Sequence, residues 1–174
     1  MPFPLYHFGP SGFVALTLRR WIDVPVFILG NVAVDVEVAV ISLFGIGWPY
    51  HRFCHSIAGG IVVGIALGLI AYPFMPVFKW GMNLIKLPYQ KSSLKKLMIS
   101  GILGVWLHVF VDAIYHWDLR IFWPSNAKPL YNLLTQNQVK LGCLIFWVLI
   151  IIPYILAVRQ YYKNKTTPKT TNQQ

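Results

Sequence analysis

Residues 97–116 read LMISGILGVWLHVFVDAIYH, an apolar segment that carries His108, Asp112 and His116. On a helix, side chains four residues apart are rotated by only about 40° per step, so the three share one face. Insertion scales put the cost of a charged residue near the middle of a membrane helix at about 2.5–3.5 kcal/mol, so such a residue needs a partner. We therefore expect the rest of the chain to supply partners for this face.

The composition predicts a small polytopic membrane protein. Of 174 residues 56% are hydrophobic and 11% are charged, with a mean hydropathy of +0.57. The net charge of +10 could suggest a nucleic-acid partner, but Lys and Arg lie between apolar segments, where they act as topology signals. We expect one membrane-embedded helical domain over residues 1–162, a disordered basic and polar tail over 163–174, and no nucleic-acid partner.

Four segments are long and apolar enough to cross a bilayer. They are residues 24–47, 49–73, 97–116 and roughly 139–158. Residues 1–20 are too short and too interrupted by Pro and Gly to span, which indicates an interfacial or re-entrant segment that carries His7. The predicted fold class is all-α: a polytopic membrane protein with about four transmembrane helices and this N-terminal segment.

Two basic segments predict the topology. The loop from Lys79 to Lys96 and the tail after Val158 contain Lys and Arg without acidic residues, so both should be cytoplasmic. Two spans separate them, as a shared side requires. Both termini are then cytoplasmic, and the polar ends of the spans, at His51 and His116, lie toward the outer face of the membrane.

The first span carries two carboxylates, Asp35 and Glu37. Positions i and i+2 on a helix lie about 200° apart, so these two are not expected to face one site. Asn31 lies one turn before Asp35 and could hold it by a hydrogen bond, which favours Asp35 as the site residue.

The second span begins in the stretch WPYHRFCHS at 48–56. Pro49 suits the first turn of a helix, so we expect His51 and His55 to lie one turn apart on one face. Arg52 is either a contact for lipid headgroups, which we favour, or a phosphate clamp. Asp118 and Arg120, in the loop after the third span, are interpreted as a loop ion pair.

Nearly all acidic and imidazole side chains lie in or beside apolar segments. The chain has five His and five acidic residues, and only Asp23 has an ordinary position. Taken singly, a buried His is usually a hydrogen-bonded core residue, and His108 with Asp112 is the strongest pair. Imidazole and carboxylate together suit zinc or another first-row divalent ion, and the set is large enough for one or two ions.

The order of these motifs resembles a known family. The run of His7, VDVE at 34–37, HRxxHS at 51–56, HxxxD at 108–112 and WP at 123–124 is similar to bacterial inner-membrane metal-dependent hydrolases, some described as LexA-binding. That family is distantly similar to zinc-dependent phospholipase C and related single-strand nucleases, all-α proteins that bind a metal cluster through His and Asp. The resemblance covers roughly residues 1–125 and implies a bacterial inner-membrane location.

The resemblance also implies a ligand set. The metal ligands or their immediate supports would be His7, Asp35, His51, His55, His108 and Asp112, with Glu37, Arg52 and His116 as additional candidates. The family usually has Pro where Val34 stands and often Asp where Glu37 stands. Whether the helix breaks at this position, and whether Glu37 reaches metal, therefore stays open.

These observations predict a membrane-embedded, phospholipase C-like hydrolase. Metal-activated water, with zinc as the expected metal, would cleave a phosphoester in a lipid or lipid-linked substrate, and Asp35 would act as ligand or general base. A metal-binding regulatory or structural protein is one alternative, and its site would be closed by protein ligands. An ion or proton pathway is the other, but apart from Asn31 the cytoplasmic half offers few polar residues for it.

Overall fold

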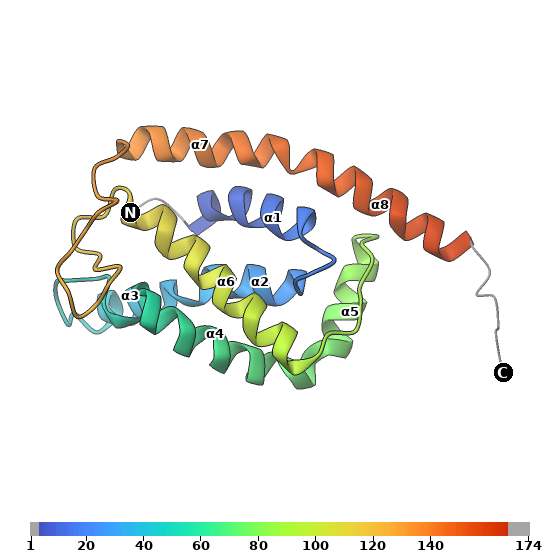
Figure 1. Cartoon of the computed structure of the whole chain (residues 1–174), viewed down its shortest axis with the longest axis horizontal. Coiled ribbons are helices and arrows are strands. Elements are labelled where there is room, and N and C mark those ends of the chain that lie inside the picture. Colours follow the sequence, from blue (N-terminus) through green and yellow to red (C-terminus); the bar gives the residue numbers. More distant parts are fainter. Residues whose placement is uncertain (1–3, 167–174) are drawn as a thin grey trace.

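The computed structural model describes residues 4–166, and every regular element in this part of the chain is a helix (Figure 1). Four helical segments are long and apolar enough to cross a membrane: Val24–Leu43, Ile57–Leu84, Leu94–Ala113 and Gln136–Thr166. The predicted fold class is confirmed. In chain order the elements are the short 3₁₀ helix η1 (Pro4–His7), α1 (Phe8–Thr17), α2 (Val24–Ala33), α3 (Asp35–Leu43), η2 (Phe53–His55), α4 (Ile57–Ala71), η3 (Tyr72–Phe74), α5 (Met75–Leu84), α6 (Leu94–Ala113), α7 (Gln136–Leu149) and α8 (Ile151–Thr166).

The ends of the spans differ from the sequence prediction in three places. The Ser56 hydroxyl accepts a hydrogen bond from the Gly59 amide, so this residue caps α4 and the helix begins well after Pro49. The chain bends through η3 and continues as α5, which places Lys79 in a helix rather than in a loop. Helix α8 runs to Thr166, so the first residues of the predicted tail are helical, and the rest of that tail lies outside the described residues.

Helix α6 packs against both α2 and α4, and glycines make these contacts close. A Cβ added at Gly30 would lie 2.5 Å from the carbonyl oxygen of Gly101, and one added at Gly64 would lie 2.3 Å from the Ile102 amide nitrogen. Without side chains at these positions the helix backbones can touch. This packing fixes where the polar face of α6 lies relative to its neighbours.

The N-terminal segment is a short helix inside the bundle. Helix α1 has ten residues, too few to span, and packs against α2 and α7 with Ala15 and Leu16 buried. Its start is held tightly against α7, because a Cβ at Gly9 would lie 2.4 Å from the Cys143 carbonyl oxygen. This contact sets the position of His7, which is the last residue of η1 and directly precedes α1.

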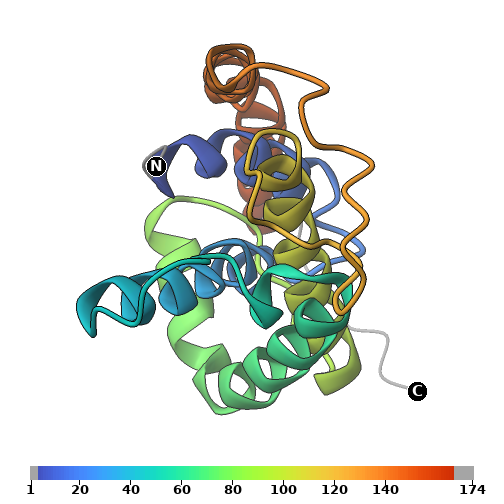
Figure 2. The ribbon, with the colours of Figure 1, turned by 90° about the vertical axis from the view of Figure 1, so that its left-hand side faces the viewer.

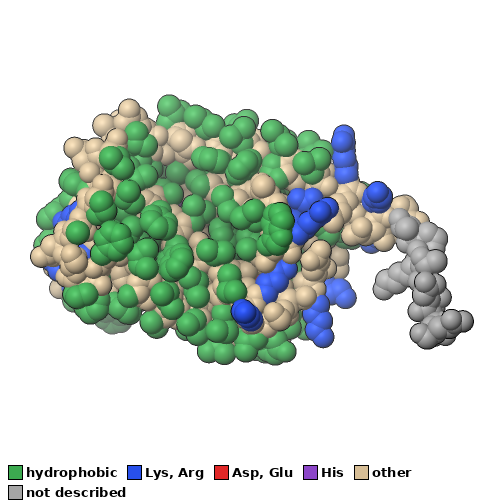
Figure 3. All heavy atoms as spheres, in the orientation of Figure 1, with side chains coloured by type: hydrophobic (Ala, Val, Ile, Leu, Met, Phe, Trp, Pro, Cys, Tyr) green, Lys and Arg blue, Asp and Glu red, His purple; other side chains and the backbone are tan. Residues whose placement is uncertain are grey.

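The two ends of the bundle are chemically different. Loops 44–56 and 114–135 gather at one end, which we call the site end; Figure 2 views the molecule from that side. The other end, which we call the basic end, holds residues 18–23, 75–96 and 159–166. On the face shown in Figure 3 the flanks are largely hydrophobic and Lys and Arg side chains gather at the basic end. Apolar flanks between polar ends are what a bilayer requires.

Candidate metal centre

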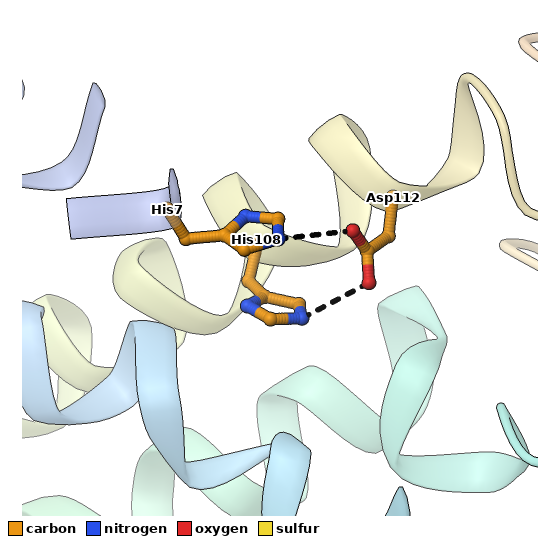
Figure 4. Close-up of side chains that lie close together, drawn as sticks. All are labelled: His7, His108 and Asp112. Carbon is orange, nitrogen blue, oxygen red and sulfur yellow. Dashed lines mark ion pairs between the residues drawn. The ribbon is translucent and has the colours of Figure 1, made fainter. Parts of the chain in front are cut away.

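Two side chains of α6 form the base of the site. His108 and Asp112 lie one turn apart, with His108 Nε2 at 3.1 Å from Asp112 Oδ2. Helix η1 adds His7, whose Nε2 lies 3.1 Å from Asp112 Oδ1, and the rings of His7 and His108 stack with centroids 4.2 Å apart (Figure 4). All three side chains are buried. The polar face predicted for residues 97–116 therefore points into a cluster of partners.

The first span contributes Asp35 just after a local irregularity. Helix α2 ends at Ala33 and α3 begins at Asp35, but Val34 between them keeps right-handed helical dihedrals (φ −70°, ψ −29°), so the span continues through this position. Asp35 Oδ1 lies 3.4 Å from His108 Nε2. The Asp35 side chain is 26% exposed, against 4% for Asp112, so Asp35 is the more accessible of the two carboxylates.

One expectation for this span is wrong. The Asn31 amide donates to the Gly104 carbonyl oxygen of α6 at 3.4 Å and does not bond Asp35, because α6 lies directly against this part of α2. Glu37 belongs to none of the three donor groups and has a separate partner, since its Oε2 lies 2.9 Å from His55 Nδ1. The chain before α4 supplies this partner to the second face of α3.

That same chain supplies His51 and His55, and the structure corrects how they are presented. His51 precedes η2 and His55 ends it, so the two do not lie on one face of a regular helix. The His55 ring centroid lies 5.6 Å from that of His108, and His51 Nε2 lies 3.8 Å from Asp112 Oδ2. His116, just beyond α6, has its Nε2 3.9 Å from the same oxygen.

The donor atoms converge in three overlapping groups, with the ligand atoms of each group within 4.8 Å of one another. The groups are His7, His108 and Asp112; Asp35, His55 and His108; and His51, Asp112 and His116. For tetrahedral zinc with bonds of about 2.0–2.1 Å, ligand atoms lie about 3.3 Å apart. The separations of 3.1 and 3.4 Å around His108 Nε2 are close to that value.

Further carboxylates hold the imidazoles from outside. Asp118 Oδ1 lies 2.9 Å from His51 Nδ1, and Asp118 Oδ2 accepts hydrogen bonds from the Tyr50 and His51 amides. Glu37 binds Nδ1 of His55 in the same way and also accepts from the Arg52 and Cys54 amides. A proton on Nδ1 leaves the Nε2 lone pair directed into the cluster, as in metal sites where a carboxylate orients a ligating histidine.

The groups at the rim have pKa values that suit metal binding. Burial lowers the pKa of His116 to about 4 and also lowers that of His55, so both rings are neutral at pH 7. Burial alone would raise the pKa of Asp118, but its hydrogen bonds with His51 hold that pKa well below the ordinary value. Burial and the nearby Asp112 raise the pKa of Tyr115, so its hydroxyl stays protonated and donates to Asp112 Oδ1 at 2.8 Å.

Several buried nitrogens of the cluster make no hydrogen bond to any residue from 4 to 166. They are Nδ1 of His7, Nε2 of His55 and Nδ1 of His108, while Nε2 of His108 makes only its ion-pair contacts with Asp112 and Asp35. A buried polar atom without a partner costs about 1–3 kcal/mol. Neutral imidazoles and carboxylates with free lone pairs are the donors that zinc and similar ions take. The residues present therefore fit a divalent metal, and the donor set accommodates one ion or two.

Two other sequence interpretations change. Asp118 bonds His51 instead of pairing with Arg120, and Arg52 donates from its guanidinium to the carbonyl oxygens of Gly47 and Pro49. Arg52 thus braces the loop at the site end. Sequence reasoning missed the outer roles of Asp118 and Tyr115. The position of Asp118 two residues after His116 was a signal, but its main partner lies 67 residues away in the chain.

Comparison with known proteins gives one match. The model of a family described as YdjM inner membrane protein matches residues 14–169. No curated protein and no solved structure matches the chain.

Proposed function

The chain belongs to the YdjM inner membrane protein family, and on that premise we propose that it is a membrane-embedded, metal-dependent hydrolase. The observation that carries the proposal is the cluster at the site end, where three overlapping groups of donors converge and several buried imidazole nitrogens make no hydrogen bond within residues 4–166. The four apolar spans and the family place the chain in the bacterial inner membrane. A substrate in a lipid or lipid-linked molecule, with a phosphoester as the bond cleaved, suits that location.

The residues that would hold metal are His7, His55, His108 and Asp112, with the His51 and His116 pair beside them, and Asp35 would serve as ligand or as general base. The donor set favours zinc. When bound, such an ion acts as a Lewis acid and brings the pKa of water toward neutrality. Around it, the carboxylates of Asp118 and Glu37 keep the imidazoles oriented, which is a positioning role.

Asp35 is the candidate general base. Asp112 contacts four imidazoles and one hydroxyl, and the other carboxylates at the site end are bound to backbone amides and a histidine. Asp35 instead has one imidazole contact, at 3.4 Å, and is partly exposed. It therefore has oxygen lone pairs free to take a proton from water when a substrate is bound.

A cation beside the cluster supports an anionic substrate. Lys140, in the first half of α7, lies with Tyr6, His7 and Tyr115 where η1, the end of α6 and α7 meet. Its charge suits the phosphate of an anionic lipid headgroup. The alternative, a structural or regulatory metal site, is disfavoured by the partial exposure of Asp35, since structural zinc sites are closed by protein ligands.

The sidedness of the site is part of the proposal. The basic end should face the cytoplasm, because cytoplasmic segments carry the excess of Lys and Arg. The end of α8 would then be cytoplasmic and the site end would face the periplasm. Because η1 carries His7 into the cluster at the site end, this N-terminal element would lie on the periplasmic side, which corrects the expectation that both termini are cytoplasmic.

The test is hydrolysis by protein purified in mild detergent, measured on a panel of phospholipids and generic phosphodiesters beside the metal content. Replacing Asp35 with Asn keeps the size of the side chain but removes the base, so turnover should fall by roughly a hundredfold or more while helicity and most of the metal remain. If wild type with metal bound cleaves nothing in the panel, or if Asp35→Asn is as active as wild type, the catalytic proposal fails and the structural alternative is favoured.

A further inference from the structure

A second pocket, chemically unlike the metal cluster, lies near the basic end. It has a volume of about 560 Å³, is open to the surface, and is bounded by α1, α2, α5 and the junction of α7 and α8. Its walls are apolar: Leu16, Ile28, Phe78 and Ile150 are typical of them, and the Tyr154 hydroxyl is engaged with the Ile85 carbonyl oxygen at 3.3 Å. Its lining includes none of the candidate metal ligands. The volume is that of a typical ligand site.

The walls of this pocket decide what kind of group fits. A water molecule in a protein cavity needs two to four polar partners, and this lining offers almost none. Most of the walls belong to helical segments that are long and apolar enough to cross a membrane, so hydrocarbon is the expected solvent beside them. An acyl chain from that hydrocarbon matches both the size and the chemistry of the space.

Cations lie at the rim of the pocket. The Arg19 guanidinium donates to the carbonyl oxygen of Leu16, a lining residue, at 2.9 Å and also binds Gln160. Lys86 lies between the lining residues Ile85 and Leu87. Within residues 4–166, neither cation is in an ion pair with a carboxylate. Four of the five acidic residues are in the metal cluster or bound to its histidines, and Asp23 is buried and hydrogen-bonded.

We propose that this pocket binds one acyl chain of an anionic phospholipid, with the lipid phosphate held by Arg19 and Lys86. Apolar pockets between membrane helices with basic rims on the cytoplasmic side are suited to anionic lipid headgroups. The positive charge at the rim selects the headgroup, and the apolar walls receive the tail. This site is independent of the proposed hydrolase, because it uses other helices and other side chains.

A lipid in this position would also hold α5 in place. After η3 the chain turns, and α5 lies across the end of the bundle instead of continuing the line of α4 (Figure 1). The pocket separates α5 from α1 and the start of α8. An acyl chain between them would bridge these elements, so lipid that binds the folded state should stabilise it.

Gly81 gives a direct way to fill the pocket. A Cβ added at Gly81, which lines the pocket on α5, would meet no atom within 4 Å. Gly142 on α7 has equally open space above it but is not part of the lining, so Gly142→Leu is the matched control for Gly81→Leu. Both changes add the same side chain to a half-buried helical glycine.

The experiment measures thermal unfolding of detergent-purified protein with added phosphatidylglycerol or phosphatidylcholine. We expect phosphatidylglycerol to raise the Tm of wild type and of Gly142→Leu by about 5 °C or more, and phosphatidylcholine to do much less. Gly81→Leu should lose this response. The double variant Arg19→Gln, Lys86→Gln should fold but respond alike to both lipids.

Three results would overturn the proposal. An unchanged response in Gly81→Leu would place the lipid elsewhere, and equal responses of wild type to both lipids would exclude the role of the cations. A change of oligomeric state in Gly81→Leu, without any lipid effect on wild type, would assign the pocket to a second copy of the chain. None of these readouts depends on hydrolysis, so the two proposals fail separately.

Discussion

Two buried aspartates, Asp23 and Asp112, lie toward opposite ends of the bundle, and their surroundings differ in kind. At the basic end, Asp23 Oδ1 accepts from the Val26 amide at 3.2 Å and Oδ2 from the Ser92 hydroxyl at 2.7 Å. Its own amide donates to the Ser100 hydroxyl at 2.7 Å. Each oxygen has a neutral, fixed donor. This carboxylate caps α2 and ties it to α6 and the loop before it, which is a structural role.

Asp112 is surrounded by bases instead. Nitrogens of four imidazoles lie within 4 Å of its two oxygens, and two of those rings, His7 and His108, have a buried nitrogen that makes no hydrogen bond within residues 4–166. A carboxylate with two oxygens cannot satisfy so many rings, whereas a cation placed between them can. The difference teaches that burial of an acid is not a sign of function by itself. What distinguishes the site end is an excess of lone pairs over donors.

The largest expected effect is all-or-none and tests which end faces outward. In a background with Cys54 and Cys143 replaced by Ser, a single cysteine at Asn126 should react with an impermeant thiol reagent in intact cells. One at Lys91 should react only after the membrane is opened. Both positions are exposed, so burial does not limit the reaction. The reverse pattern would place the metal cluster at the cytoplasmic face and contradict the charge rule.

The next effect is loss of metal. Asp112 belongs to two of the three donor groups, so Asp112→Ala should remove nearly all bound metal and lower the Tm, because metal binding stabilises the folded state. Elemental analysis of purified protein measures this directly. His108→Ala should act in the same way, since His108 is also shared by two groups. Full metal occupancy in both variants would remove the basis for a metal site.

Much of this arrangement could be predicted from the chain because the determining signals are local. The four spans follow from length and apolar composition, and the pairing of His108 with Asp112 follows from their spacing of four residues on a helix. The sequence left the helix geometry before Asp35 undecided, because Val34 is compatible with a continuous helix, and the structure keeps Val34 helical. Around this position α6 packs against α2, and Glu37 accepts from the Arg52 and Cys54 amides.

The rest depends on contacts between segments far apart in the chain. Nothing near Asp118 indicates that it bonds His51, and nothing near Asn31 indicates that the Gly104 carbonyl takes its hydrogen bond in place of Asp35. Two local signals compete for the start of α4. Pro49 suits a first helical turn, but Ser56 is the residue whose hydroxyl caps the helix. Such competition is decided by packing, here by the fold of residues 51–55 over α3.

A smaller effect is expected outside the donor groups. Asp118→Asn removes the charge that orients His51 but leaves each donor group intact. Changes to a carboxylate that orients a ligating histidine typically weaken metal binding by about 10–100-fold. Competition with a chelator of known affinity measures this. Arg120→Gln, two residues away and exposed, is the matched control and should bind as wild type does. Equal metal affinity in both variants would show that Asp118 only holds the loop through the Tyr50 and His51 amides and does not support metal binding.

The smallest effect is expected at Asp23, the structural aspartate at the basic end. Asp23→Asn replaces an acceptor oxygen with an amide donor that meets the Ser92 hydroxyl or the Val26 amide. A buried donor or acceptor left without a partner costs about 1–3 kcal/mol, so the unfolding midpoint should fall while metal content and hydrolysis stay as in wild type. Ser92→Ala removes one donor only and should cost less. The most informative comparison measures the Tm and the metal content of both Asp23→Asn and Asp112→Ala. If Asp23→Asn also lost its metal, α6 would couple the two ends, and the separation between a structural and a functional aspartate would fail.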